Sequence, residues 1–232
     1  MGELIGFQLL DLSQLDAQFV GFPKGTGTGR LPAILSFDGA RPTDHPDERP
    51  ARKLELENIT AMNHSFFMEQ ALAEARRALE RGEFPVGCVI VLSEKIIATG
   101  SRQGTAGDLV SETDHAEILA LKQLERSAPV DCSQMTIYCT LEPCLMCFGA
   151  ILISGIRRIV FAYEDVMGGG TRCDLGPMPP LYSSLPVNLV PHILRDKSLF
   201  LFKSFFSNPD NTYWKDSLLA AYTLSAPFSV SS

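Results

Sequence analysis

The chain has 232 residues, 45% hydrophobic and 20% charged, which predicts a globular protein with one full domain plus extensions. Its formal net charge of −7 argues against a large surface for nucleic-acid backbone, since such surfaces are usually basic. No segment reaches the run of about 20 apolar residues that a membrane span needs. Because the N-terminus also lacks the pattern of a secretory signal, we expect a soluble, cytoplasmic protein.

Residues 1–61 differ from the rest of the chain. The stretch from Gly21 to Pro50 is dense in Gly, Pro, Thr and Asp and has no sustained period of 2 or 3.6 residues. We therefore predict a poorly ordered N-terminal extension over 1–61. The catalytic-type domain follows over 62–206, and residues 207–232 form a C-terminal tail.

Hydrophobic periodicity predicts alternating helices and strands between these extensions. Ser65 can cap a first helix, and the apolar segment Val86–Leu92 is typical of a strand covered on both faces. The predicted helices span residues 65–81, 115–126, 144–153 and 195–206. The predicted strands span residues 86–92, 96–100, 134–140, 159–162 and 187–190, and a loop covers 165–186. This alternation indicates an α/β fold with three α/β/α layers.

Two short motifs carry residues suited to metal chemistry. The first is Asp114-His115-Ala116-Glu117, and the second is Glu142-Pro143-Cys144-Leu145-Met146-Cys147. The two cysteines are three residues apart at a predicted helix start, so both sulfurs lie on one face and can reach one ion. A helix N-terminus also favours the thiolate form, which is the form that binds metal.

The donor set predicts a catalytic zinc ion. His115, Cys144 and Cys147 supply three ligands and leave one coordination position open, which distinguishes catalytic from structural zinc. Glu117 is too close in sequence to His115 to be a comfortable second ligand. We expect Glu117 to move protons between water, a ring nitrogen and a leaving amine.

These residues form the signature H-x-E followed by P-C-x-x-C, and the chain resembles the cytidine deaminase superfamily. The similarity extends over roughly residues 63–206 and is greatest to bacterial tRNA adenosine deaminases. It includes segments beginning at Phe84, Thr140 and Arg158 and a helix ending at Phe206. The resemblance implies a five-stranded mixed sheet, one Zn²⁺ per subunit, a homodimer, and hydrolytic deamination of a nucleobase.

Three departures from that family bear on the substrate. Arg102 stands near the place where the family usually has an Asn that contacts the base, the loop 166–172 differs, and the tail with Tyr213, Trp214 and Tyr222 is extra. Candidate substrate contacts are Arg102, Ala116 and Pro143, although Pro143 has a sufficient role in starting its helix. Three glycines, Gly168–Gly170, could approach a phosphate or belong to a mobile loop.

Three functions stay open at this stage. The first is deamination of wobble adenosine in tRNA to inosine. The second is deamination of a free base, nucleoside or nucleotide such as guanine, cytosine, cytidine or dCMP, which the acidic charge and the missing Asn favour. The third is a non-catalytic zinc module, including a structural site with Cys139 or Cys173 as fourth ligand.

The remaining side chains that attract attention have simpler interpretations. Phe205 and Phe206 are expected in the core rather than stacked on RNA, and Trp214 is expected to anchor the tail. His64 and His192 have no partner pattern. The cysteines outside the C-x-x-C pair are expected to be thiols, because a large chain without a secretory signal gives no reason for disulfides.

Overall fold

The computed structural model describes residues 48–107, 110–126 and 131–229, with side chains described from Asn63 onward. A five-stranded sheet forms its centre, with strand order β2-β1-β3-β4-β5. The strands are β1 (Gly87–Leu92), β2 (Lys95–Ser101), β3 (Thr136–Leu141), β4 (Arg158–Tyr163) and β5 (Asn188–Val190). β1 pairs antiparallel with β2 and β3, whereas β3, β4 and β5 run parallel. The predicted mixed sheet is therefore confirmed.

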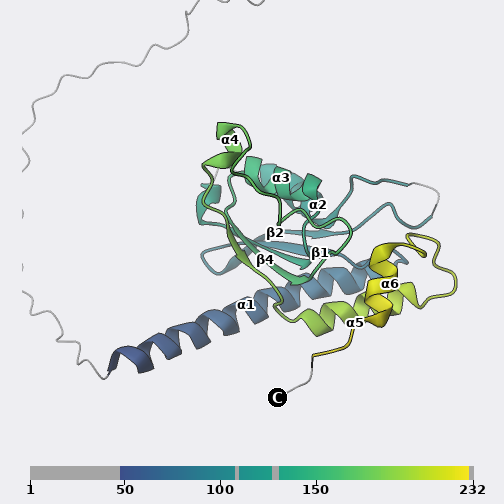
Figure 1. Cartoon of the computed structure of the whole chain (residues 1–232), viewed down its shortest axis with the longest axis horizontal. Helices are drawn as coiled ribbons and strands as arrows, with labels where there is room; N and C mark the ends of the chain where they lie inside the picture. The colour runs from purple at the N-terminus through teal and green to yellow at the C-terminus, as the bar shows by residue number, and fades with distance from the viewer. Residues whose placement is uncertain (1–47, 108–109, 127–130, 230–232) are drawn as a thin grey trace, which may run out of the picture. The chain divides into compact units, whose positions relative to one another are not determined.

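Helices cover both faces of the sheet (Figure 1). On one face lie α2 (Ala116–Glu125) and α3 (Leu145–Ile153), and on the other lie α1 (Glu48–Glu80) and α5 (Arg195–Phe206). The core has two clusters. One joins α1 to Val89, Tyr138 and Val160. The other joins α2 and α3 to the alternate side chains of the same strands and includes most of the buried residues of α5 and α6. The three-layer α/β/α prediction is confirmed.

Several element boundaries differ from the sequence prediction. Helix α1 begins at Glu48, not at Ser65, because residues 48–62 are rich in Glu, Leu, Ala and Lys, which favour helix. The rest of the predicted extension, 1–47, lies outside the described residues. Two short helices also occur where none was predicted: α4 (Pro180–Ser183) in the long loop and α6 (Leu218–Ser225) in the tail. None of the described helices is long and apolar enough to cross a membrane.

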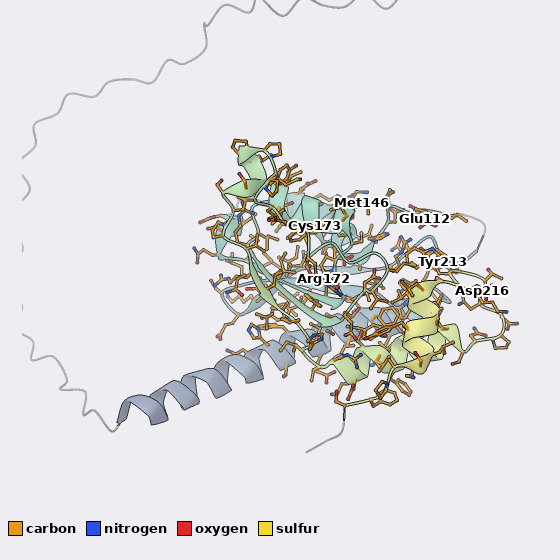
Figure 2. All side chains as sticks on the ribbon, in the orientation of Figure 1. Glu112, Met146, Arg172, Cys173, Tyr213 and Asp216 are labelled. Carbon is orange, nitrogen blue, oxygen red and sulfur yellow. The ribbon has the colours of Figure 1, made fainter. Side chains whose placement is uncertain are left out.

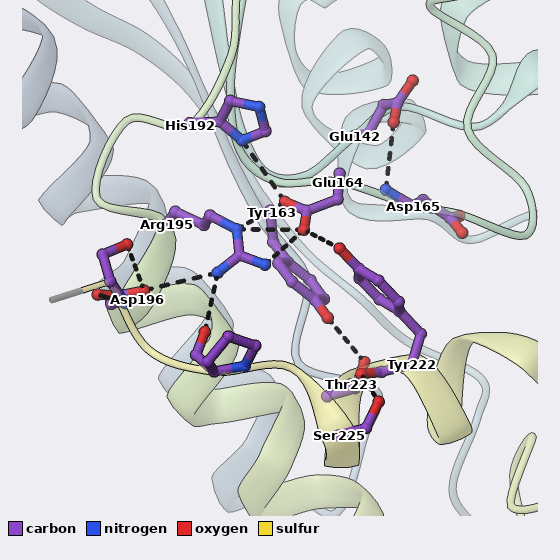
Figure 3. Close-up of polar contacts among 12 residues, drawn as sticks. Glu142, Tyr163, Glu164, Asp165, His192, Arg195, Asp196, Tyr222, Thr223 and Ser225 are labelled. Atoms are coloured by element: carbon purple, nitrogen blue, oxygen red, sulfur yellow. Dashed lines mark hydrogen bonds and ion pairs between the residues drawn. The ribbon is translucent and has the colours of Figure 1, made fainter.

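A polar cluster fastens α6 to the end of β4 (Figure 3). Arg195, the first residue of α5, donates from Nε to Glu164 Oε2 at 2.8 Å. Tyr222 Oη donates to Glu164 Oε1 at 2.7 Å, and the hydroxyls of Tyr163 and Thr223 are 3.1 Å apart. These contacts hold the start of α5 and the second half of α6 against the end of β4.

Candidate active site

Two helix starts bring the predicted metal ligands together. His115 is the N-cap residue of α2, and Cys144 is the N-cap residue of α3. His115 takes the cap position of α2 in an extended conformation, without a side-chain cap bond. That extended backbone keeps the imidazole outside the helical cylinder, so it can reach the sulfurs of α3.

The three ligand atoms form one compact group. His115 Nδ1 lies 3.6 Å from Cys144 Sγ and 3.4 Å from Cys147 Sγ. Zinc bonds of about 2.3 Å to sulfur and 2.05 Å to nitrogen, at a tetrahedral angle, would place S and N about 3.6 Å apart. The donor set and its spacing therefore fit zinc. In the described part of the chain, neither Cys139 nor Cys173 belongs to the group, which removes the fourth sulfur that a structural site needs.

The thiols of Cys144 and Cys147 differ in pKa. A hydrogen bond from Cys147, joined by one from His115, lowers the pKa of the Cys144 thiol to about 4 in spite of burial. The bond to Cys144 and burial both raise the pKa of Cys147. Without a cation the pair shares one proton, and a divalent cation would displace it.

Glu117 lies beside the ligands and is 3% exposed. Its Oε2 accepts from Cys147 Sγ at 3.6 Å, and burial raises the pKa of the carboxyl. A carboxyl with a raised pKa can both accept and return a proton near neutral pH. This arrangement suits the predicted role of Glu117 as the proton-transfer group.

A pocket opens onto this centre. The lining residues include the metal-site and loop side chains His115, Glu117, Glu142, Cys144, Asp165 and Gly168. The opposite wall comes from Phe84, Val86, Arg102, Leu141, Tyr213 and Trp214. Such a concave site, apolar with a few convergent polar groups, is typical of small planar ligands.

The three predicted substrate contacts differ in their position relative to the pocket. Arg102 lines the pocket and is 2% exposed, so its interpretation as a surface residue is wrong. Ala116 is buried in the core cluster, and Pro143 is buried and accepts from Gly170 N at 2.8 Å. Neither belongs to the pocket lining. Their use as substrate contacts stays a prediction.

The glycine loop is held in place by its own backbone. Gly168 N donates to Asp165 Oδ1 at 2.8 Å, Gly169 N to Asp165 O at 3.1 Å, and Gly170 N to Pro143 O at 2.8 Å. Because these amides are used, they offer no cradle for a phosphate. Gly169 also pairs with Cys144 in an isolated bridge, so the loop supports the metal site rather than moving freely.

Sequence reasoning missed two acidic residues and two aromatic ones. Glu142 is 2% exposed and accepts from Thr171 Oγ1 at 2.5 Å, and Asp165 is 5% exposed. Tyr213 and Trp214 line the pocket, a role beyond anchoring the tail. Figure 2 labels Tyr213, which lies near helix α6. The only sequence signal for these buried acidic residues was that they lie close to the motifs in the chain. No local pattern predicts that residues of the C-terminal tail line the pocket.

The other expectations fare as follows. Phe205 and Phe206 are buried, as predicted. His64 and His192 do have partners: His64 Nδ1 lies 3.0 Å from Tyr138 Oη, and His192 Nδ1 lies 3.5 Å from Glu164 Oε2. Cys88, Cys139, Cys144, Cys147 and Cys173 are free thiols.

Comparison with known proteins agrees with this geometry. The family model of the cytidine and deoxycytidylate deaminase zinc-binding region matches residues 61–163. A tRNA-specific adenosine deaminase of Buchnera aphidicola is 36% identical over 62% of this chain and 94% of its own length. That of Agrobacterium fabrum is 39% identical over 56% and 90%. A probable cytosine deaminase of Schizosaccharomyces pombe is 29% identical over 60% and 90%.

Among solved structures, NE0047 in complex with 2,6-diaminopurine aligns with a TM-score of 0.52 and 22% identity. The alignment covers 63% of this chain and 82% of that chain, and it supports the fold. The identity to relatives that align over at least nine-tenths of their own length, and the His-Cys-Cys group beside a buried glutamate, lead to one assignment. The chain belongs to the cytidine and deoxycytidylate deaminase family and is a zinc-dependent hydrolytic deaminase.

Proposed function

We propose that this deaminase acts on tRNA and converts the adenosine at the wobble position to inosine. The relatives that support this proposal are tRNA-specific adenosine deaminases at 34–39% identity that align over at least nine-tenths of their own length. The observation that carries it is the buried carboxyl of Glu117 beside three zinc-ligand atoms, at a pocket that all but Cys147 of these residues line.

The chemistry follows from the positions of these side chains. His115, Cys144 and Cys147 would hold one zinc ion per subunit, which supplies a hydroxide nucleophile at neutral pH. Glu117 takes one proton from the attacking water and gives it to the ring nitrogen, and it then takes the second proton from the added hydroxyl and gives it to the leaving amine. Water adds to the ring carbon, the carbon–nitrogen bond breaks, and ammonia leaves.

The direct test is incubation with a tRNA that carries adenosine at position 34, followed by sequencing for inosine. Glu117→Gln should lower kcat by at least about 100-fold while the zinc content stays unchanged, because only the proton transfer is removed. Glu125→Gln, exposed on the same helix, is the matched control and should keep wild-type activity. Turnover that survives Glu117→Gln would overturn the mechanism.

A free base, nucleoside or nucleotide is the second candidate substrate. Arg102 replaces the usual Asn in the pocket, and Tyr213 and Trp214 narrow it with a wall that belongs to the extra tail. Ammonia release over a panel of adenosine, cytidine, cytosine, guanine and dCMP tests this candidate. Release from the panel without inosine in tRNA would replace the first proposal.

We also propose a homodimer in the cytoplasm. Cys147 and Phe148 of α3 face the sheet, while Leu145, Met146 and Ile153 are exposed on the opposite side. Gly149 lies between them with open space in front, so a second copy could approach closely. Sedimentation should give a dimer that Ile153→Lys weakens and Leu224→Lys, on α6, does not. The thiol ligands suit a reducing compartment.

A further inference from the structure

The segment between α5 and α6 brings two aromatic rings to the active-site pocket. Tyr213 and Trp214 line it together with Glu117 and His115. Their rings are stacked, with centroids 5.0 Å apart and an interplanar angle of 14°. Phe84 meets both from the side, at 5.6 and 5.7 Å. Together, Tyr213, Trp214 and Phe84 form an aromatic wall of the pocket.

The backbone of this wall is fixed. Trp214 has φ +51°, in the left-handed region that residues other than glycine rarely adopt. Tyr213 N donates to Asn211 Oδ1 at 2.9 Å, and Ser217 N donates to Trp214 O at 3.1 Å. A strained conformation persists where the surroundings determine it, and such residues gather at ligand sites.

Arg102 adds hydrogen-bond donors to the same wall. Its Nη1 donates to Gln103 O at 2.8 Å, Nη2 lies 3.5 Å from Tyr213 Oη, and Nη2 is 3.7 Å from Glu112 Oε2. A guanidinium has five N–H donors, so these contacts with described residues leave donors for a ligand. Tyr213 Oη in turn donates to Glu112 Oε2 at 3.0 Å, which ties the phenol and the guanidinium to one carboxylate.

We propose that Arg102, Tyr213 and Trp214 select the substrate base, which makes the C-terminal segment part of the active site. The aromatic pair contacts the planar base, and Arg102 donates to an acceptor on its edge, a ring nitrogen or a carbonyl oxygen. The Tyr213 hydroxyl is a positioning group that holds the guanidinium. This inference rests on the proposed deaminase pocket, but it does not depend on whether the base belongs to tRNA.

Binding can be followed without turnover, because Trp214 is the only tryptophan of the chain. In the zinc-loaded Glu117→Gln protein, the fluorescence of Trp214 should change on titration with an adenosine-34 anticodon stem–loop or with the small bases of the panel. Phe228→Ala, an exposed aromatic truncation in the same tail, should leave the titration unchanged. No change with any probe would overturn the inference.

Kinetics provide the second readout, on whichever substrate the wild-type protein deaminates. Arg102→Ala should raise KM about tenfold or more with kcat and zinc content little changed, because a charged hydrogen bond to the bound base is lost. Arg102→Lys should restore part of the loss. Tyr213→Phe, which keeps the ring, should raise KM several-fold. Wild-type KM in both Arg102→Ala and Tyr213→Phe would overturn the inference.

The two proposals fail separately. Inosine formation in tRNA with no change of Trp214 fluorescence would overturn the aromatic wall and leave the tRNA assignment standing. A fluorescence change caused by a small base, in a protein that leaves tRNA unmodified, would support the wall and overturn the tRNA assignment.

Discussion

Replacing Glu164 by Gln should show how much the contacts of Glu164 with Arg195 and Tyr222 contribute to the free energy of unfolding. Burial alone would raise the pKa of Glu164, but hydrogen bonds from Arg195 and Tyr222 outweigh it and lower the pKa from 4.5 to about 2. A shift of about 2.5 units corresponds to at most about 3.4 kcal/mol of folding free energy. The side chains of Arg195 and Glu164 are 18% and 13% exposed, so solvent screening reduces this to about 1–2 kcal/mol.

The sign of the pH dependence follows from the lowered pKa. The contribution is complete above the unfolded pKa near 4.5 and disappears as the pH falls through about 2. At pH 3 about two-fifths of it should remain. Urea unfolding of wild type and Glu164→Gln should therefore differ by about 1–2 kcal/mol at pH 7 and by less than half of that at pH 3.

The control for this measurement is Glu94→Gln, an exposed side chain on the β1–β2 turn, which should unfold like wild type at both values of pH. A difference between Glu164→Gln and wild type that is equal at pH 7 and pH 3 would refute the reasoning, because it would come from packing and not from charge. A difference below about 0.3 kcal/mol at pH 7 would refute the stability claim itself.

Three further predictions concern the metal site, its supporting loop and the core. Cys147→Ser should lose its zinc, measured by metal analysis, and its deaminase activity, whereas Cys173→Ser, at an exposed thiol, should retain both. Chelation of zinc from the wild-type protein should lower its Tm, and added zinc should restore the Tm. Gly169→Ala should destabilise by about 1–3 kcal/mol in urea unfolding, because a Cβ there would lie 2.5 Å from Glu142 Cδ and 2.6 Å from Asp165 O. Gly149→Ala, with open space in helix α3, should instead stabilise by about 0.5–1 kcal/mol. Phe202→Ala, at a fully buried ring packed on Phe84 and Tyr163, should cost about 3–5 kcal/mol in the same assay, and a loss under 1 kcal/mol would contradict its place in the core.

Local patterns predicted the layers of the fold, and they also predicted that His115, Cys144 and Cys147 come together. The apolar strand at residues 87–92 and the i, i+3 spacing of Cys144 and Cys147 contain their own structural information, since the side-chain periods of strands and helices are fixed. The same is true of Phe205 and Phe206, which lie on the buried side of an amphipathic helix.

The parts that sequence reasoning missed depend on contacts between distant residues. From the sequence alone, Arg102 lies in a loop after a predicted strand. Its place in the pocket becomes clear only from its contact with Tyr213, which is 111 residues away in the chain. The glycine loop reads as mobile until its amides are seen bonded to Asp165 and Pro143. Helix α6 has a clear cap in Ser217, but its burial is decided by Glu164 and Tyr163 on a distant strand.

The opposed starts of α2 and α3 have an electrostatic consequence. Two thiolates, one carboxylate and one divalent cation carry a net charge of −1 in a site that contains Cys147 and Glu117, both buried. Each helix start contributes roughly half a positive charge from its aligned peptide groups. The two helix starts therefore offset part of the negative charge of the thiolates and Glu117 without a side chain that would occupy space in the pocket.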